Sequence, residues 1–385
     1  MKPDAKLGAD VIIIGGGLQG TSSALQLARR GLRVTLLEAQ YCGRHASGVN
    51  AGGVRTLGRH VAEIPLALAA RGMWHRLAEL TGEDADFVPS GQLKVAESEA
   101  ELEVLRGRVT QLEALGFTHE ELVDAHTVRK LVPSITPHVT GAIWARDDGH
   151  ALPYRAVTAF RRAAARAGAA IHEGTPALQV ERTENHWLVR TPRGTFSASH
   201  LVNTAGAWAG EFAGQVGEPV PVQVGGLMLM ITYRVAPFVK PVLGATGRAL
   251  SFKQFANGTV LIGGGLRCEA DAKARHGEVD MLKLATSAQT VTALFPHLGP
   301  LAINRAWAGV EAFMPDDIPV ISRSRCAPDL VHAFGFSAHG FELGPIVGQI
   351  VAELVTEGRA SLPIEAFAID RFDKPQAVRA AALHD

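Results

Sequence analysis

The sequence predicts a mixed α/β (α+β) fold, in which a Rossmann-like domain carries an inserted, mainly antiparallel β-sheet domain. The chain has 385 residues, more than one ordinary hydrophobic core holds, so two domains are expected. Strand–helix units of the nucleotide-binding type occur at the start, in the middle and at the end of the chain, and β-rich segments interrupt them. We therefore expect the second domain to be threaded into the first rather than to follow it.

A glycine-rich turn follows the first apolar run, residues 11–14. Gly15, Gly17 and Gly20 have the G-x-G-x-x-G spacing, and a helix-like stretch, 21–30, comes next. Gly15 permits a tight turn, Gly17 lets the backbone approach a pyrophosphate, and Gly20 lets the helix pack closely on the strand. The free N–H groups at the helix N-terminus favour phosphate. This arrangement predicts dinucleotide binding; the alternative is a glycine-rich loop between packed elements.

The second predicted strand, residues 34–37, ends in Glu38, about 20 residues after the turn. A carboxylate at this place can accept hydrogen bonds from ribose hydroxyls. We also assign Leu18, Gln19 and Ala39, which adjoin these residues, to the nucleotide site.

The composition argues for a globular protein and against nucleic acid or an anionic membrane as the main partner. Hydrophobic residues make up 47% of the chain, and 38 Lys plus Arg balance 38 Asp plus Glu. Cys42, Cys268 and Cys326 are scattered without zinc or iron–sulfur spacing, so reduced thiols and no metal site are expected. The run 11–14 is too short for a signal peptide or a membrane span, and we expect a cytoplasmic protein.

The later helices are predicted from apolar residues at helical spacing and from glycines that end them, such as Gly116 and Gly168. They cover residues 59–80, 99–115, 154–167, 279–295 and 345–356. The strands are predicted from apolar and alternating runs, and Asn257-Gly258 marks a hairpin turn. They cover residues 87–96 (a pair), 141–153 (a strand and turn), 169–172, 177–182, 187–191, 195–199 (running into the segment 201–208), 250–255, 259–263 and 330–334.

Four segments in fixed order match one family: 15–20 with Glu38, 43–53, 203–208 and 335–340. On these segments the chain resembles the D-amino-acid-oxidase-like flavoproteins, which include glycine oxidase, sarcosine oxidase and dimethylglycine dehydrogenase. The resemblance covers essentially the whole chain and is greatest to the flavin β-subunits of bacterial opine and D-hydroxyproline dehydrogenases. It implies FAD as the cofactor. We accordingly divide the chain into an FAD-binding domain over residues 1–86, 151–218 and 325–385, and a substrate-binding domain over residues 87–150 and 219–324.

The last three segments, together with Val180 in the preceding hairpin and Phe341, supply the other predicted FAD contacts. Small residues in 43–53 let the backbone pass beneath a flat ring. The segment 335–345 opens the last helix, whose N–H groups face the flavin pyrimidine in related enzymes. The alternatives are an ordinary surface loop and a plain helix start with His339 merely packed. The predicted contacts are Arg44, Ser47, Asn50, Ala51, Gly52, Gly53, Val180 (its backbone on adenine), Ala205, Gly206, Trp208, Gly335, Ser337, His339, Gly340 and Phe341.

The substrate-binding residues are predicted from one position that matches the resembled family and two positions that differ from it. Arg55 matches the arginine that holds the substrate carboxylate in related sarcosine oxidases, a role that suits its fork geometry; the alternative is that it braces the loop. Glu311 stands where glycine oxidases have an arginine, and Glu342 where sarcosine oxidases have a lysine. These departures favour a substrate with an additional positive group, such as an opine built on arginine. The alternative is that both glutamates pair with local arginines and never contact substrate.

The resemblance implies oxidation of the C–N bond of an N-substituted or D-amino acid, which is opine-, hydroxyproline- or sarcosine-like. A hydride passes from Cα to flavin N5, and the imine then hydrolyses. His339 is the candidate general base, because its pKa ordinarily lies near neutral pH. FAD is expected to be non-covalent, because residues 309–313 lack the cysteine that attaches the ring in some relatives.

The electron acceptor is left open. A glycine- or sarcosine-type oxidase would use O2 directly and rely on a lysine beside the flavin, for which Lys253 is the candidate. A dehydrogenase would pass electrons to partner subunits. Two further alternatives are a nicotinamide-dependent dehydrogenase, with Glu38 on the NAD ribose, and a non-catalytic flavin subunit of a multi-subunit dehydrogenase.

Overall fold

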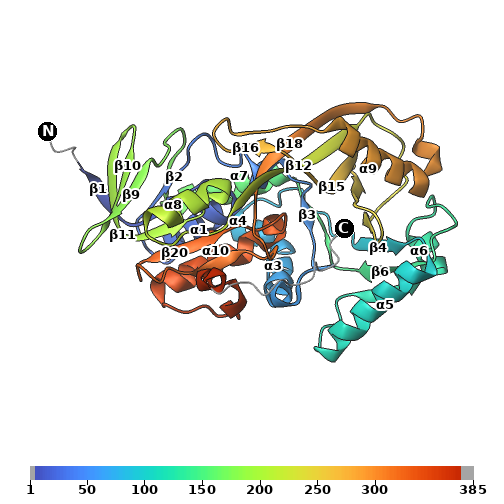
Figure 1. The fold of residues 1–385 in the computed structure, drawn as a ribbon, viewed down its shortest axis with the longest axis horizontal. Helices are drawn as coiled ribbons and strands as arrows, with labels where there is room; N and C mark the ends of the chain where they lie inside the picture. Colours follow the sequence, from blue (N-terminus) through green and yellow to red (C-terminus); the bar gives the residue numbers. More distant parts are fainter. Residues whose placement is uncertain (1–4, 374–385) are drawn as a thin grey trace.

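Two large β-sheets organise the chain, one on each side of the view in Figure 1. The structure is a computed structural model that describes residues 5–373. Residues 1–4 and 374–385, the outer ends of the predicted FAD-binding segments 1–86 and 325–385, lie outside the described residues.

The first sheet has the strand order β19-β20-β11-β1-β2-β8, with β10 and β9 added beside β11. The strands from β20 to β8 run parallel, whereas β19, β10 and β9 are antiparallel to their neighbours. A parallel strand covered on both faces is apolar throughout, which explains the run 11–14. The strands are β1 Ala5–Ile14, β2 Val34–Leu37, β8 Ala170–His172, β9 Gln179–Arg182, β10 Trp187–Thr191, β11 Gly194–Asn203, β19 Val320–Arg323 and β20 Leu330–Phe334.

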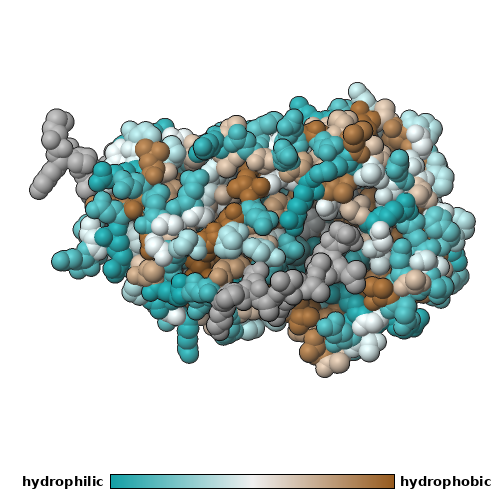
Figure 2. Space-filling model, in the orientation of Figure 1, coloured by the Kyte–Doolittle hydropathy of each residue, from teal (hydrophilic) through white to brown (hydrophobic). Residues whose placement is uncertain are grey.

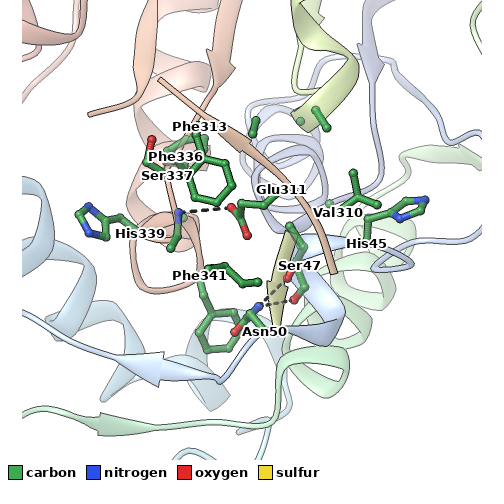
Figure 3. A pocket seen from close by; sticks show the side chains of 18 of the residues that line it. His45, Ser47, Asn50, Val310, Glu311, Phe313, Phe336, Ser337, His339 and Phe341 are labelled. Carbon is green, nitrogen blue, oxygen red and sulfur yellow. Dashed lines mark hydrogen bonds between the residues drawn. The ribbon is translucent and has the colours of Figure 1, made fainter. Parts of the chain in front are cut away.

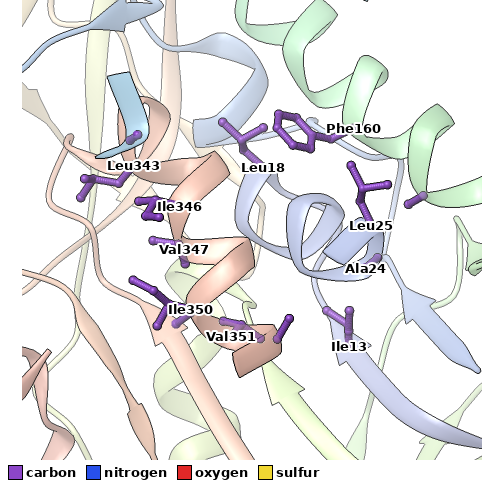
Figure 4. Packing of buried hydrophobic residues seen from close by; sticks show 14 of the residues in the cluster. Ile13, Leu18, Ala24, Leu25, Phe160, Leu343, Ile346, Val347, Ile350 and Val351 are labelled. Atoms are coloured by element: carbon purple, nitrogen blue, oxygen red, sulfur yellow. The ribbon is translucent and has the colours of Figure 1, made fainter. Parts of the chain in front are cut away.

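Helices cover this sheet and place the glycine-rich turn. Helix α1 (Leu18–Arg29) packs between α10 (Gly340–Thr356) and α7 (Pro153–Arg166), as Figure 4 shows for Leu18, Leu25 and Ile346. The other helices and 3₁₀ turns of this part are α2 Ala46–Val49, η1 Val61–Glu63, α3 Ile64–Trp74, α4 Leu77–Thr81, η2 Gly206–Trp208, α8 Ala209–Gln215, η4 Glu365–Phe367 and η5 Ile369–Phe372.

The second sheet has the order β18-β12-β15-β14-β13-β4-β6-β5 and is antiparallel except where β13 pairs with β4. One face packs on α9 through a separate hydrophobic cluster. Its elements are β4 Gln92–Ala96, α5 Glu99–Ala114, β5 Glu121–Asp124, α6 Ala125–Leu131, β6 Gly141–Ala145, β12 Gln223–Thr232, β13 Val242–Ala245, β14 Ser251–Gln254, β15 Val260–Cys268, α9 Met281–Leu294, η3 Pro296–Leu298 and β18 Ile303–Phe313.

Two short antiparallel ribbons complete the described strands: β3 (Gly53–Val54) pairs with β7 (Gly149–His150), and β16 (Ala270–Asp271) pairs with β17 (His276–Gly277). On the face in Figure 2, hydrophobic side chains gather in small separate groups among hydrophilic ones.

The predicted fold class is confirmed, but several element predictions were wrong in detail. The helix predicted over 59–80 is broken after Trp74, where the His75 ring bonds the Asp147 backbone oxygen. The strand pair predicted over 87–96 is β4 alone, because only Val88 of its first half forms a bridge. The strand predicted over 195–199 is longer than expected: β11 runs from Gly194 to Asn203 and is followed by η2.

Three further differences concern elements and boundaries. Strands β5 and β18 and helix α6 were not predicted as such. Helix α10 begins five residues before Pro345, earlier than predicted. Strand β19 lies within 219–324 but pairs with β20 in the first sheet, so the chain returns to that sheet before Val320.

Candidate active site

The glycine-rich turn has the backbone geometry that its spacing predicts. Gly15 has φ +105°, and a Cβ there would lie 2.4 Å from the Thr204 oxygen. A Cβ on Gly20 would lie 1.9 Å from the Gly15 oxygen, so α1 approaches the turn as closely as only glycine allows. The backbone N–H of Leu18 donates to Ser47 Oγ at 3.0 Å. The loop after β2 therefore holds the turn from the opposite side.

Glu38 ends β2 and closes the same turn. Its Oε2 accepts from the Gly16 N–H at 2.7 Å and its Oε1 from the Gln40 N–H at 2.7 Å. Burial raises the pKa of Glu38 despite these two bonds. Each carboxylate oxygen keeps a further lone pair, so the fixed side chain can still accept from ribose hydroxyls.

One cavity of about 970 Å³ runs from this turn to the second sheet. Ligand pockets span about 300–1,000 Å³, so this one suits a large ligand together with a small one. Twenty-two of the predicted site residues line it: Gly15, Gly17, Gln19, Glu38, Ala39, Arg44, Ser47, Asn50, Ala51, Gly52, Gly53, Arg55, Ala205, Gly206, Trp208, Glu311, Gly335, Ser337, His339, Gly340, Phe341 and Glu342.

Three predicted contacts do not line the cavity. Leu18 is buried against α10 and α7, and Gly20 lies under the turn. Val180 is buried in the β9–β10 hairpin, and its backbone N–H donates to Gln215 Oε1 at 2.8 Å. That N–H is therefore occupied by the protein in this structure.

The loop after β2 is shaped by Asn50. Its Nδ2 donates to the backbone oxygens of Ala46 and Ser47 at 2.8 and 3.1 Å, and its Oδ1 accepts from the Gly52 N–H at 2.6 Å (Figure 3). Gly52 has φ +70°, and a Cβ there would lie 2.2 Å from the Ala151 oxygen. The loop is thus fixed with small residues facing the cavity.

The segment before α10 is held in an unusual backbone conformation. Ser337 and Ala338 have φ of +47° and +71°, which non-glycine residues rarely adopt. The Ser337 N–H donates to the Ala312 oxygen at 3.1 Å, and Ser337 Oγ accepts from the Met314 N–H at 3.0 Å. Backbone strain of this kind is typical of functional sites.

The two glutamates predicted on the substrate side have different surroundings. Glu311, on β18, lines the cavity, and among the described residues its Oε1 accepts one hydrogen bond, from the Ala338 N–H at 3.4 Å (Figure 3). Burial raises its pKa to about 7. Glu342, by contrast, is 0% exposed and its Oε2 lies 3.4 Å from Arg59 Nη2. For Glu342 the geometry therefore favours pairing with a local arginine.

His339 is bound on one side by an acid. Its Nδ1 lies 3.0 Å from Glu63 Oε2, and Figure 3 shows its ring pointing away from Glu311. Burial and then Arg59 lower its pKa to about 4, so the ring is neutral near pH 7 and Nδ1–H donates to Glu63. The geometry of His339 therefore favours a side chain held in place by Glu63 over the predicted general base.

Eight cationic side chains line the cavity, and half of them have a carboxylate within 4 Å among the described residues. The paired ones are Arg59 with Glu342, Arg248 with Glu97, Arg267 with Asp317 and Lys283 with Asp280. The other four are Arg44, Arg55, Lys94 and Arg275. The charge of Arg275 favours the ionised form of Glu38, and its guanidinium lies over the Trp208 ring. Arg275 is therefore at the end of the cavity that holds the glycine-rich turn.

Gln92, Lys94 and Arg275 line the cavity but were not among the site residues predicted from the sequence. A signal for Lys94 exists, because it is a charged residue between Leu93 and Val95 in a strand. Arg275 belongs to the short β16–β17 ribbon, for which the sequence carries no such signal.

The turn, the acid that ends β2 and the long cavity together form a site of the dinucleotide-binding type. The chain belongs to the FAD dependent oxidoreductase family (DAO), which matches residues 10–354. It is 27% identical to a glycine oxidase of Bacillus licheniformis, over 94% of this chain and 97% of that protein. It is also 27% identical to an opine oxidase subunit of Rhizobium meliloti, over 96% and 99%. The structure of L-proline dehydrogenase from P. horikoshii is similar with a TM-score of 0.88 and 27% identity, over 95% and 98%.

The chain is therefore an FAD-dependent amine or amino-acid oxidoreductase, with FAD as its cofactor. This finding replaces the nicotinamide-dependent alternative. The residues fit FAD: the glycine cradle has no room for a Cβ at Gly15, Glu38 is fixed for ribose, and Arg44 and Arg275 offer unpaired charge for a diphosphate. Within residues 5–373, every helix is too short or too polar to cross a bilayer.

Proposed function

We propose that this enzyme oxidises the C–N bond of an N-substituted amino acid whose carboxylate binds Arg55. The observation that carries the proposal is the guanidinium itself, which lines the cavity with no carboxylate of the described residues within 4 Å. Burial and then Arg59 lower its pKa to about 10, so it stays charged at neutral pH. A buried charge without a partner is unfavourable, and a bidentate carboxylate would remove that cost.

The chain's own contribution is to bind and orient the substrate. Arg55 would bind the substrate carboxylate. The loop 43–53 and the segment before α10 would hold the flavin ring in place. FAD, when bound, would supply the acceptor for the hydride that leaves Cα, while the amine loses a proton and the C–N bond becomes a C=N bond. Holding the reacting carbon in one place converts an encounter between two molecules into a reaction within one complex, which accounts for much of such catalysis.

The electron acceptor has two candidates. Similarity to a protein named as a subunit of an opine oxidase supports a chain that works with partner subunits. Lys253 supports direct use of O2, because its buried Nζ donates to the backbone oxygen of Ala51 in the predicted flavin loop. Burial lowers the pKa of Lys253 to about 7.

Anaerobic bleaching of the flavin absorbance tests the function. The purified protein would be mixed with glycine, sarcosine, D-proline, D-hydroxyproline and an arginine-derived opine. We expect selective bleaching by a secondary amine, and slow recovery in air if partner subunits take the electrons. A flavin that none of these amines reduces would contradict the proposal and favour a non-catalytic flavin subunit.

A further inference from the structure

The cavity ends on one face of the second sheet, where β4 presents two polar side chains. Gln92 and Lys94 are two residues apart in the strand and therefore share a face. Leu93 and Val95 point the other way, into the hydrophobic cluster beneath α9. Val242 and Gly244, the β13 partners of Gln92 and Lys94, also line the cavity. The polar pair is thus part of the cavity wall.

Lys94 has no anionic partner in the protein. No carboxylate of residues 5–373 lies within 4 Å of its Nζ. The negative charge of Glu120 favours the charged form of Lys94, but the Glu120 carboxylate already accepts hydrogen bonds from Arg108 Nε and Nη2 at 2.7 and 2.6 Å. Burial and then Arg55 lower the pKa of Lys94, so the two cations lie close enough to repel each other.

Gln92 is an independent sign of a ligand. It is 7% exposed, it lines the cavity, and its Oε1 is buried without a hydrogen-bond partner. An unpartnered buried amide is unfavourable, and native proteins leave few of them. A half turn of the amide exchanges its oxygen and nitrogen, so it can offer N–H donors beside the Lys94 ammonium.

The other two cavity-lining cations at this end each have a carboxylate partner. Arg59 Nη2 lies 3.4 Å from Glu342 Oε2, and the Arg248 guanidinium pairs with Glu97. Arg55 and Lys94 are therefore the two charges here that lack a counter-ion among the described residues.

We propose that Lys94 and Gln92 form a second anion site beside Arg55, so that the substrate is an amino acid with two carboxylates. The inference rests on the proposed function, because the first carboxylate is the one at Arg55. A single carboxylate would leave one of two adjacent charges unbalanced, whereas a dicarboxylate balances both.

Thioether analogues test this without any oxidation of a C–N bond. (Methylthio)acetate carries one carboxylate; thiodiacetate carries two, and 3-(carboxymethylthio)propanoate spaces them one carbon further apart. Their dissociation constants would be measured on the FAD-loaded protein by calorimetry and by the change in flavin absorbance. The variants are Lys94→Gln and Lys94→Arg, with Lys240→Gln as a control, because Lys240 is exposed and does not line the cavity.

At least one dicarboxylate should bind ten-fold or more tightly than (methylthio)acetate. Lys94→Gln should abolish that difference, whereas Lys94→Arg and Lys240→Gln should keep it. Equal binding of the three analogues, or a difference that survives in Lys94→Gln, would overturn the inference. The proposed function fails separately: a protein that prefers dicarboxylates but is bleached by no amine would keep the second anion site and lose the amine oxidation.

Discussion

Replacing Glu311 by Gln tests whether the cavity selects a substrate with a positive group. Burial moves the pKa of this carboxyl from an ordinary 4.5 to about 7. The difference of about 2.5, at about 1.36 kcal/mol for each pKa unit, corresponds to about 3 kcal/mol of unfavourable burial of the ionised form. A cation placed against Glu311 that offsets this cost would be preferred over a neutral group on the order of a hundred-fold.

The assay is the rate of anaerobic flavin reduction by an arginine-derived opine and by sarcosine between pH 6 and 9. A raised pKa means that the carboxyl is neutral below about pH 7 and ionised above it, so the preference for the cationic substrate should increase through that pH. Glu311→Gln should remove both the increase and most of the preference. Glu211→Gln, at an exposed position on the cavity rim, is the matched control. Equal losses for both substrates in Glu311→Gln would refute charge selection.

Three further outcomes follow from the structure. Gly20→Ala should lower the free energy of unfolding by about 2–4 kcal/mol and reduce the FAD content, because its Cβ would lie 1.9 Å from the Gly15 oxygen. Urea unfolding measures the stability and the flavin-to-protein absorbance ratio measures the FAD content; a variant that is as stable and as fully loaded as the native protein would contradict the prediction. Hydrogen bonds from His332, Ser324 and the Arg325 backbone outweigh burial and lower the pKa of Glu218 to about 2, so about 3 kcal/mol of stability is present above pH 4.5 and lost as the pH falls toward 2. Glu218→Gln should flatten this part of the pH profile of urea unfolding, and an unchanged slope would refute this explanation. If O2 is the acceptor, Lys253→Met should slow reoxidation in stopped-flow experiments at least ten-fold with little change in the rate of reduction by the amine, and unchanged reoxidation would exclude that role.

The fold was predicted where local chemistry dominates. The apolar run 11–14, the glycines after it and Glu38 act within one strand–turn–helix unit, so their roles follow from spacing alone. Strand β18 was missed as such because its first residues are exposed and its partner β12 lies some 80 residues earlier in the chain. Pairing over such distances has no local signal.

The site was predicted in part for the same reason. Arg55 and Glu311 belong to motifs, and both line the cavity. The partner of Glu342 could not be read from the sequence, because Arg59 meets it only through the packing of α10 beside α3. Lys94 lines the cavity because β4 belongs to a sheet whose other strands come mostly from residues 219–324. That pairing is distant in sequence, so the role of Lys94 as a lining residue could not be predicted from its own segment.

The most direct test of the central claim is the concentration dependence of flavin reduction in Arg55→Gln. The native protein should be reduced anaerobically by a secondary amino acid at a rate that saturates with its concentration. In Arg55→Gln the half-saturating concentration should rise at least a hundred-fold, with FAD content unchanged, because a charge-assisted bidentate contact contributes about 3 kcal/mol. An unchanged half-saturating concentration would show that Arg55 does not hold the substrate carboxylate.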